Sequence, residues 1–346
     1  MKNLTEIIKP QESIALSKIT PLLDWGLIIV EGEDSGIFLQ NQLTNSVLDL
    51  EKAKHGQLAE GHTQVRLVGY CNPKGRMLAS AWIGLFSLGD EQLKNQYFLF
   101  LSKDIAKDVA KRLSMFVLRS KVNVRDLSDQ WNVSCVHGLD INPASLLSSK
   151  NQAILSLPPV ERDGLNFNRF IIASLNNDPV LFNQETINAN LELSLADWNS
   201  LEVLSGIPRI VSNTQDQFIP QMINFESVNG VDFKKGCYPG QEIVARSQYR
   251  GVVKRRLQLA HMFCTPPIDK ELSNAIKPGS ELFNSNDPNQ PAGMIVLSAP
   301  NPYQPNRIDM QIECKLNKLN EGTLHLGNPS GPVLTPGNIP YSLLQI

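Results

Sequence analysis

Residues 231–256 read VDFKKGCYPGQEIVARSQYRGVVKRR, and they place a thiol, a helix start and a dense group of basic residues within one short span. Pro239 suits the first position of a helix, because the N–H group that proline lacks would have no partner there. The spacing predicts a short helix over 239–248. The residues expected on one face of this helix are Ile243, Val244 and Ser247. The stretch therefore predicts a loop that carries Cys237 to the amino end of a helix.

Cys237 is the candidate reactive group of the chain. Unpaired N–H groups and the macrodipole at a helix start favour negative charge, and Lys234, Lys235 and Arg246 would add to that field. Each of these effects favours the thiolate. The alternative, which the spacing alone leaves open, is that Cys237 is a small buried hydrophobic residue.

The composition describes an ordinary globular protein of more than one domain. The chain has 346 residues, of which 42% are hydrophobic and 19% charged, so two or three hydrophobic cores are expected. The net charge of −2 favours no nucleic acid as a partner of the whole molecule, and DNA binding is not expected. Residues 1–20 lack the apolar core of a signal peptide, and no segment approaches the roughly 18 apolar residues of a membrane span. We expect a cytoplasmic protein without membrane contact.

The cysteines indicate neither a metal site nor a disulfide framework. There are five, an odd number: Cys71, Cys135, Cys237, Cys264 and Cys314. None belongs to a Cys-x-x-Cys pair, which zinc sites and thiol-redox motifs commonly use. No metal ligands are therefore assigned.

Residues 22–205 alternate between apolar runs and turns and contain no glycine-rich phosphate loop, which favours an α+β class. Strands are expected at 22–30, 64–68, 77–86, 97–101, 132–136 and 169–173, a helix at 104–115, and partly a loop at 142–159. A further helix over 191–205 would end at Gly206 and Pro208. Its apolar stripe is Leu191, Leu195, Trp198, Leu201 and Leu204. After about residue 254 the apolar runs become short and proline, glycine and asparagine frequent, which predicts a small β-barrel.

One octapeptide identifies a family resemblance. The motif K-G-C-Y-x-G-Q-E is matched by Lys235, Gly236, Cys237, Tyr238, Gly240, Gln241 and Glu242. With it come NQLT at 41–44, CNPKGRM at 71–77, QFIPQ at 217–221 and IPYSL at 339–343. Over most of its length the chain resembles the YgfZ family, which are folate-binding proteins tied to tRNA modification and to the upkeep of iron–sulfur enzymes.

The resemblance implies the fold of the glycine-cleavage aminomethyltransferases, with two α+β domains and a C-terminal β-barrel. In that fold the second domain is inserted into the first. The implied division is a folate-binding domain of 1–50 plus 126–253, an inserted ferredoxin-like domain of 51–125, and a barrel of 254–346.

The resemblance also implies a site for tetrahydrofolate or a related folate. From the residues alone, Trp25 and Trp198 would be core tryptophans. The family's two folate tryptophans fall at these positions, and two rings around a flat pterin would provide a large contact area at little entropic cost. The anionic glutamate tail of the folate would favour the basic residues near the motif: Lys234, Lys235, Arg246 and Arg250.

The function that follows is a folate-binding accessory protein rather than a conventional turnover enzyme. Cys237 would act as a nucleophile, as a redox thiol or as a contact to a client, and the implied clients are iron–sulfur enzymes, including those that modify tRNA.

A first alternative is a folate-dependent aminomethyltransferase that transfers one-carbon units. This chain has Ala79 and Ser80 where those enzymes carry paired acidic residues, and Leu204 where they carry a glutamate that can pair with the pterin. Glu202, about half a helical turn away, is expected to point elsewhere. Acid–base chemistry then has no evident agent.

A second alternative is a module that binds tRNA directly. Arginine and lysine with an interleaved tyrosine are typical of a nucleic-acid surface, although a solvated basic face is the commoner explanation. The residues concerned are Arg246, Tyr249, Arg250, Lys254, Arg255 and Arg256.

Overall fold

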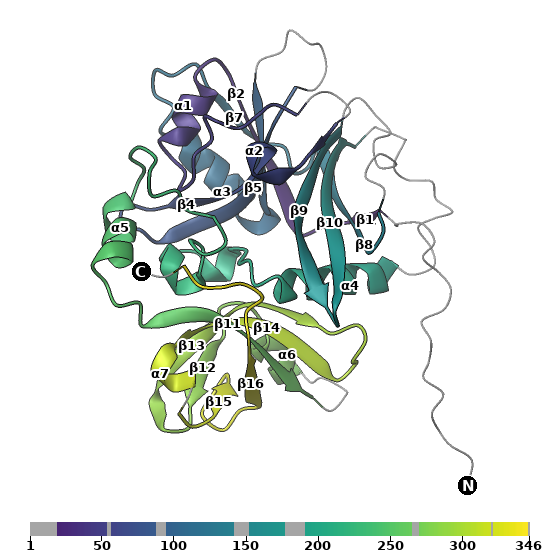
Figure 1. Ribbon diagram of the computed structural model, residues 1–346, viewed down its shortest axis with the longest axis vertical. Helices are drawn as coiled ribbons and strands as arrows, with labels where there is room; N and C mark the ends of the chain where they lie inside the picture. Colours follow the sequence, from purple (N-terminus) through teal and green to yellow (C-terminus); the bar gives the residue numbers. More distant parts are fainter. Residues whose placement is uncertain are drawn as a thin grey trace, which may run out of the picture.

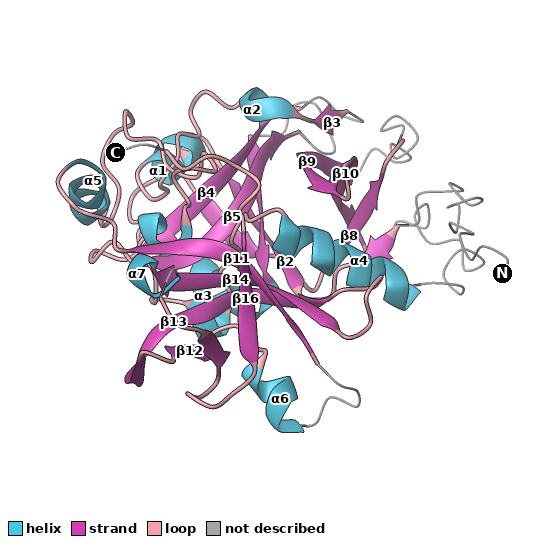
Figure 2. Ribbon diagram, turned by 60° about the horizontal axis from the view of Figure 1, so that its bottom comes forward, coloured by secondary structure: helices cyan, strands magenta, loops and turns pink. Residues whose placement is uncertain are grey.

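The computed structural model describes residues 19–53, 57–87, 95–141, 152–176, 191–264, 270–319 and 321–344. Two β-sheets lie side by side in the upper half of Figure 1, and a barrel lies below them. Helix α4 (Leu191–Leu204) runs across the junction between the sheets and the barrel, where it contacts strands of both. Figure 2 shows the same helix beside the barrel strands after rotation of the molecule.

The first sheet has the strand order β4-β5-β6-β2-β7, and every pairing in it is antiparallel. Its strands are β2 (Trp25–Glu31), β4 (Val65–Cys71), β5 (Met77–Phe86), β6 (Gln96–Ser102) and β7 (Asn123–Asp126). Helix α3 (Lys103–Ser114) packs on this sheet through a buried apolar face. All seven residues of β4 are buried, including Arg66, whose charge is paired with Asp49.

The second sheet has the order β1-β8-β10-β9-β3. Its strands are β1 (Thr20–Pro21), β3 (Leu58–Ala59), β8 (Trp131–Gly138), β9 (Gln152–Arg162) and β10 (Leu165–Leu175). Strands β9 and β10 form a long hairpin. The loop expected over part of 142–159 does not include residues 152–159, because they belong to β9 and most of them are buried. Residues 142–151 lie outside the described part of the chain.

The C-terminal part forms a closed barrel in the order β11-β14-β13-β12-β15-β16, as the sequence predicts. Its strands are β11 (Arg255–Phe263), β12 (Glu281–Asn284), β13 (Asp287–Pro300), β14 (Arg307–Lys315), β15 (Leu324–Leu326) and β16 (Val333–Gly337). The remaining described α-helices are short: α1 (Ser35–Gln40), α2 (Gly61–Gln64), α5 (Gln241–Tyr249), α6 (Lys270–Ala275) and α7 (Leu316–Leu319).

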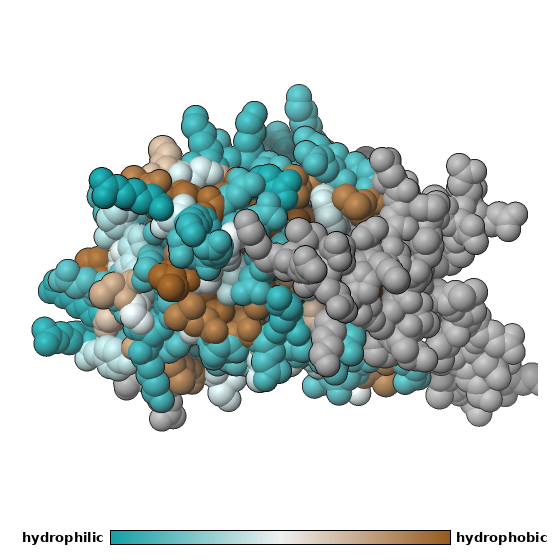
Figure 3. Space-filling model, turned by 90° about the horizontal axis from the view of Figure 1, so that it is seen from above, coloured by the Kyte–Doolittle hydropathy of each residue, from teal (hydrophilic) through white to brown (hydrophobic). Residues whose placement is uncertain are grey.

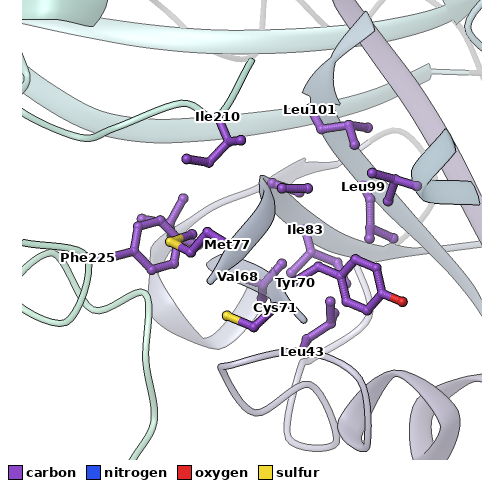
Figure 4. Packing of buried hydrophobic residues seen from close by; sticks show 14 of the residues in the cluster. Leu43, Val68, Tyr70, Cys71, Met77, Ile83, Leu99, Leu101, Ile210 and Phe225 are labelled. Carbon is purple, nitrogen blue, oxygen red and sulfur yellow. The ribbon is translucent and has the colours of Figure 1, made fainter. Parts of the chain in front are cut away.

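Separate groups of apolar side chains fill these layers. One lies between the first sheet and the segments that join it to the barrel, where Met77 lies beside Phe225 and Leu43 below Cys71 (Figure 4). A second lies between the two sheets and contains Trp25 and Trp198. A third fills the barrel. The mixed α/β architecture with its terminal barrel confirms the predicted fold class.

The predicted division of the first 253 residues does not follow the strand pairing. Strand β2, which belongs to the predicted unit 1–50 plus 126–253, lies between β6 and β7 in the first sheet. That sheet therefore contains strands of both predicted units. The inserted ferredoxin-like domain over 51–125 stays a prediction of the sequence.

The outer surface is mixed in polarity. On the face shown in Figure 3, mainly hydrophilic residues surround an area of hydrophobic ones. None of the helices in the described ranges has the length and apolar character that crossing a membrane requires.

Candidate functional site

A narrow cavity lies where the two sheets meet α4. It is lined from β2 by Trp25, from β5 by Ser80, Ala81 and Trp82, from β10 by Arg169, and from α4 by Trp198 and Glu202; further lining residues are Leu67, Phe100, Leu157, Ser205, Ile207, Pro208 and Arg209. Its volume is about 20 Å³, roughly the space of one water molecule. A larger ligand would therefore have to move side chains apart.

Both predicted folate tryptophans line this cavity. The side chains are 4% exposed for Trp25 and fully buried for Trp198, which confirms the core interpretation of each; their folate role stays a prediction. Their indole N–H groups are buried and have no acceptor among the described residues. Buried donors are nearly always satisfied in folded proteins, so these two are open to an acceptor that a ligand would bring.

An ion-pair network centred on the buried guanidinium of Arg209 forms one wall of the cavity. Arg209 donates from Nε to Glu202 Oε1 at 2.6 Å, from Nη2 to Asp24 Oδ2 at 2.7 Å and from Nη1 to Ser102 Oγ at 3.0 Å. Its guanidinium carbon lies 4.8 Å from the centre of the Trp25 ring. Burial alone would lower the pKa of Arg209, but the carboxylates of Glu202 and Asp24 hold it above its usual value. The network fixes a charged group against the Trp25 ring.

The expectation that Glu202 points elsewhere is wrong. Glu202 lies four residues after Trp198, one turn along the helix, and both side chains line the cavity. Helix α4 contacts β9 on one side and β13 and β14 on the other, so residues outside its apolar stripe are buried as well. Glu202 brings a carboxylate to the cavity, although the residue expected to correspond to the pterin-pairing glutamate of the aminomethyltransferases is Leu204.

The loop of the octapeptide motif, residues 235–240, lies in another part of the molecule and does not line this cavity. It is fixed by Lys235, which is buried and donates from Nζ to the carbonyls of Gln40 and Leu43. The same ammonium lies 4.9 Å from the centre of the Tyr238 ring. Burial lowers the pKa of Lys235 to about 8. Lys235 therefore holds the loop in place and is not a free cation for an anion to bind.

The helix after the motif begins later than predicted. Helix α5 starts at Gln241, because Gly240 adopts a φ of +81° and cannot be its first helical residue. Val244 and Gln248 are buried on its inner face, whereas Ile243 is 39% exposed. Cys237 thus lies four residues before the helix, further from its amino end than predicted.

Cys237 is exposed, whereas Cys71, Cys135 and Cys314 are buried and Cys264 is intermediate. A reactive thiol has to be accessible, so the structure favours Cys237 among these cysteines, and its alternative as a buried hydrophobic residue is wrong. Within the described ranges, no three histidine, cysteine or acidic residues come together as metal ligands.

Four basic residues are predicted to bind the glutamate tail of the folate: Lys234, Lys235, Arg246 and Arg250. None of them lines the cavity that contains Trp25 and Trp198. The cations in that cavity are Arg169 and Arg209. Neither arginine belongs to a recognisable motif: Arg169 follows alternating apolar residues and asparagines, and Arg209 lies between Pro208 and Ile210.

The basic residues within 246–256 are only partly available to a ligand, because two of them form ion pairs. Arg255 forms an ion pair with Glu313, and Arg256 forms one with the fully buried carboxylate of Glu226. Arg246, Arg250 and Lys254 are exposed, and Tyr249 is 68% exposed. The predicted nucleic-acid surface therefore loses Arg255 and Arg256.

Comparison with known proteins decides the family. The chain is 32% identical over 259 residues to the tRNA-modifying protein YgfZ of Cronobacter sakazakii. The aligned segment covers 68% of each chain. The chain is 31% identical over 256 residues to the YgfZ protein of Hamiltonella defensa, covering 72% of this chain and 70% of that one. The chain belongs to the YgfZ family. No protein-family model matches it.

The fold of this YgfZ-family chain is also found in a solved structure. The glycine cleavage system aminomethyltransferase T of Bartonella henselae superposes with a TM-score of 0.60, covering 94% of this chain and 86% of that one. The sequence identity is 12%, so this likeness concerns the fold.

Three of the segments quoted with the octapeptide lie against it or against α5. Lys235 is held by the carbonyl of Leu43 in the NQLT segment. In the CNPKGRM segment, Asn72 and Gly75 lie against Gly240 so closely that a Cβ there would meet the Gly75 Cα at 2.6 Å. From the QFIPQ segment, Gln221 donates to the carbonyl of Val244 at 2.9 Å. These segments hold the loop that carries Cys237 in place.

Proposed function

We propose that this chain binds a folate between Trp25 and Trp198 and acts as an accessory protein for tRNA modification and iron–sulfur enzyme maintenance. One observation carries the proposal: a single cavity is lined by Glu202 and by Trp25 and Trp198, whose indole N–H groups are buried and unsatisfied.

The residues present fit a folate. A reduced pterin is flat enough to lie against an indole ring, and such contacts supply area with little loss of side-chain entropy. Its amino group and ring N–H groups are donors, for which Glu202 is an acceptor, and its ring nitrogens and oxygen accept hydrogen bonds from indole N–H groups. The cavity volume of about 20 Å³ implies that the two tryptophans separate when the ligand enters.

Cys237 would act outside this cavity. Its exposure on a loop that Lys235 fixes supports a thiol that meets a macromolecular client, such as an iron–sulfur enzyme. We propose no chemical step for it, since the folate and the thiol are held by different elements.

Aminomethyl transfer is supported less well. Ala79 is buried in the core, and the Ser80 hydroxyl is engaged with the Pro208 carbonyl and the Ile210 N–H. The acidic residue that lines the cavity is Glu202, which is bound to Arg209. A free general base is therefore missing from the cavity lining.

Direct tRNA contact through Arg246, Arg250 and Lys254 is a second candidate, favoured by their exposure beside Tyr249. A gel-shift titration with tRNA at two salt concentrations tests it. Contact with phosphates would weaken steeply as the salt concentration rises, and absence of a shift at low salt would remove this candidate.

The folate site is tested by calorimetric titration with tetrahydrofolate, together with intrinsic tryptophan fluorescence. We expect saturable binding that Trp25→Phe and Trp198→Phe each weaken by about 5- to 10-fold through loss of ring contact. Trp131→Phe is the control, since Trp131 is partly buried but does not line the cavity. Cys237→Ala should leave the affinity unchanged. Absence of saturable binding by the wild type would overturn the folate proposal.

A further inference from the structure

Arg169 on β10 is a buried cation that forms no ion pair within the described ranges. Its side chain lines the cavity and the residue is 2% exposed. Among the described residues, its guanidinium donates only to the Pro158 carbonyl, from Nη2 at 3.0 Å and from Nε at 3.3 Å. Its central carbon lies 5.8 Å from the Trp198 ring centre.

The pairing of Arg169 is unusual for a buried arginine. A guanidinium has five N–H donors, and buried charges are normally paired. Arg209 in the same cavity meets two carboxylates, whereas no described carboxylate forms an ion pair with Arg169. Glu202 acts on Arg169 only from a distance, and burial lowers the pKa of Arg169 to about 10. Part of its donor capacity is therefore left for a ligand.

Helix α4 carries the complementary chemistry, because it brings Glu202 to the same cavity. The Glu202 carboxylate can only accept hydrogen bonds when ionised, and the Arg169 guanidinium can only donate them. A heterocycle that fits both must present donors on one part of its edge and an acceptor on the adjacent part. The 2-amino-4-oxo edge of a folate pterin has this arrangement, with the 4-oxo group as acceptor.

We propose that Arg169 donates to the 4-oxo oxygen of the pterin and that this contact selects 4-oxo folates over their 4-amino analogues. The inference rests on the proposed folate function and adds a specificity residue to it. A 4-amino group would direct N–H donors at the guanidinium and leave donors unsatisfied on both sides, which is the more costly mismatch in a buried site.

The test compares the dissociation constants of tetrahydrofolate and tetrahydroaminopterin, which differ at position 4, by calorimetry. We expect the wild type to bind tetrahydrofolate at least about tenfold more tightly, as for a hydrogen bond to a charged group. Equal affinities, or tighter binding of the 4-amino compound, would overturn this inference and leave the folate site intact. Failure of both ligands to bind would instead overturn the proposed function.

A variant separates recognition from structural support. Arg169→Met should weaken tetrahydrofolate about tenfold and bring the ratio of the two affinities close to one; a structural role alone would weaken both ligands equally. Arg162→Met is the control, because Arg162 on β9 is paired with Asp197 and does not line the cavity. It should keep the wild-type ratio. If Arg169→Met does not fold, the wild-type comparison still decides the proposal.

Discussion

At the scale of single residues, the cavity depends on charges that the sequence pattern does not reveal. Glu202 is flanked by the apolar residues Leu201 and Val203, and Arg169 follows alternating apolar residues and asparagines, so neither belongs to a recognisable motif. Their importance comes from burial on both sides of α4 and between the sheets, which is a tertiary property. Trp25 and Trp198 could be predicted because the family resemblance, rather than periodicity, indicated them.

Loss of the Glu202 charge should destabilise the fold. Glu202→Gln leaves the buried guanidinium of Arg209 with Asp24 as its remaining carboxylate, and removal of one partner of a buried pair costs about 3 kcal/mol or more. Urea unfolding measures the change. In the control Glu33→Gln, both partners of the ion pair are more than half exposed, so a change of roughly 0–1 kcal/mol is expected. Equal effects of the two changes would show that the buried network contributes little.

Lys235 should make stability depend on pH in the alkaline range. Its pKa is about 8 in the folded protein, lowered from 10.5, so between these values the unfolded chain binds more protons than the native protein. Stability from this group therefore rises as the pH rises from about 8 to 10.5. The unfolding free energy of wild type minus Lys235→Met, measured across this range, should increase with pH. A difference that does not change with pH would contradict the prediction.

At the scale of elements, the conformation of Gly240 limits both the motif loop and α5. A Cβ there would meet the Asn72 carbonyl oxygen and the Gly75 backbone, and its φ of +81° is unfavourable for other residues. Gly240→Ala should cost about 1–3 kcal/mol or more and should change the rate at which Cys237 reacts with a thiol reagent. The matched control is Gly236→Ala in the same motif, where a Cβ would meet no atom within 4 Å; its effect should stay within about 0.5 kcal/mol. Similar losses from both changes would show that the packing against Asn72 is not limiting.

Elements with a strong apolar pattern could be predicted, and their pairing could not. The strands corresponding to β5, β6 and β10 and the helix α4 were expected within a few residues of their observed bounds. The late start of α5 depends on the φ of Gly240, and the placement of β2 between β6 and β7 depends on contacts far apart in the chain. Neither leaves a local trace in the sequence.

At the scale of the whole molecule, the barrel holds one wall of the cavity. Gln311 on β14 is fully buried and donates from Nε2 to the carbonyls of Glu202 at 3.1 Å, Val203 at 3.0 Å and Ile207 at 3.3 Å. It satisfies the carbonyl end of α4, which has no partners within the helix. The barrel thereby supports the helix that carries Trp198 and Glu202, although Gln311 itself does not line the cavity.

This arrangement predicts that a barrel mutation weakens ligand binding. Gln311→Ala removes hydrogen bonds from several buried carbonyls, so we expect a loss of about 1–3 kcal/mol in stability and a lower affinity for tetrahydrofolate. Asn284→Ala is the control, because its amide also donates to two carbonyls, those of Lys318 and Glu321, but within the barrel. Urea unfolding should show comparable losses for the two variants, whereas calorimetry should show weaker binding only for Gln311→Ala. If both bind as the wild type does, the end of α4 is held by packing alone, and the barrel is a separate unit that does not shape the cavity.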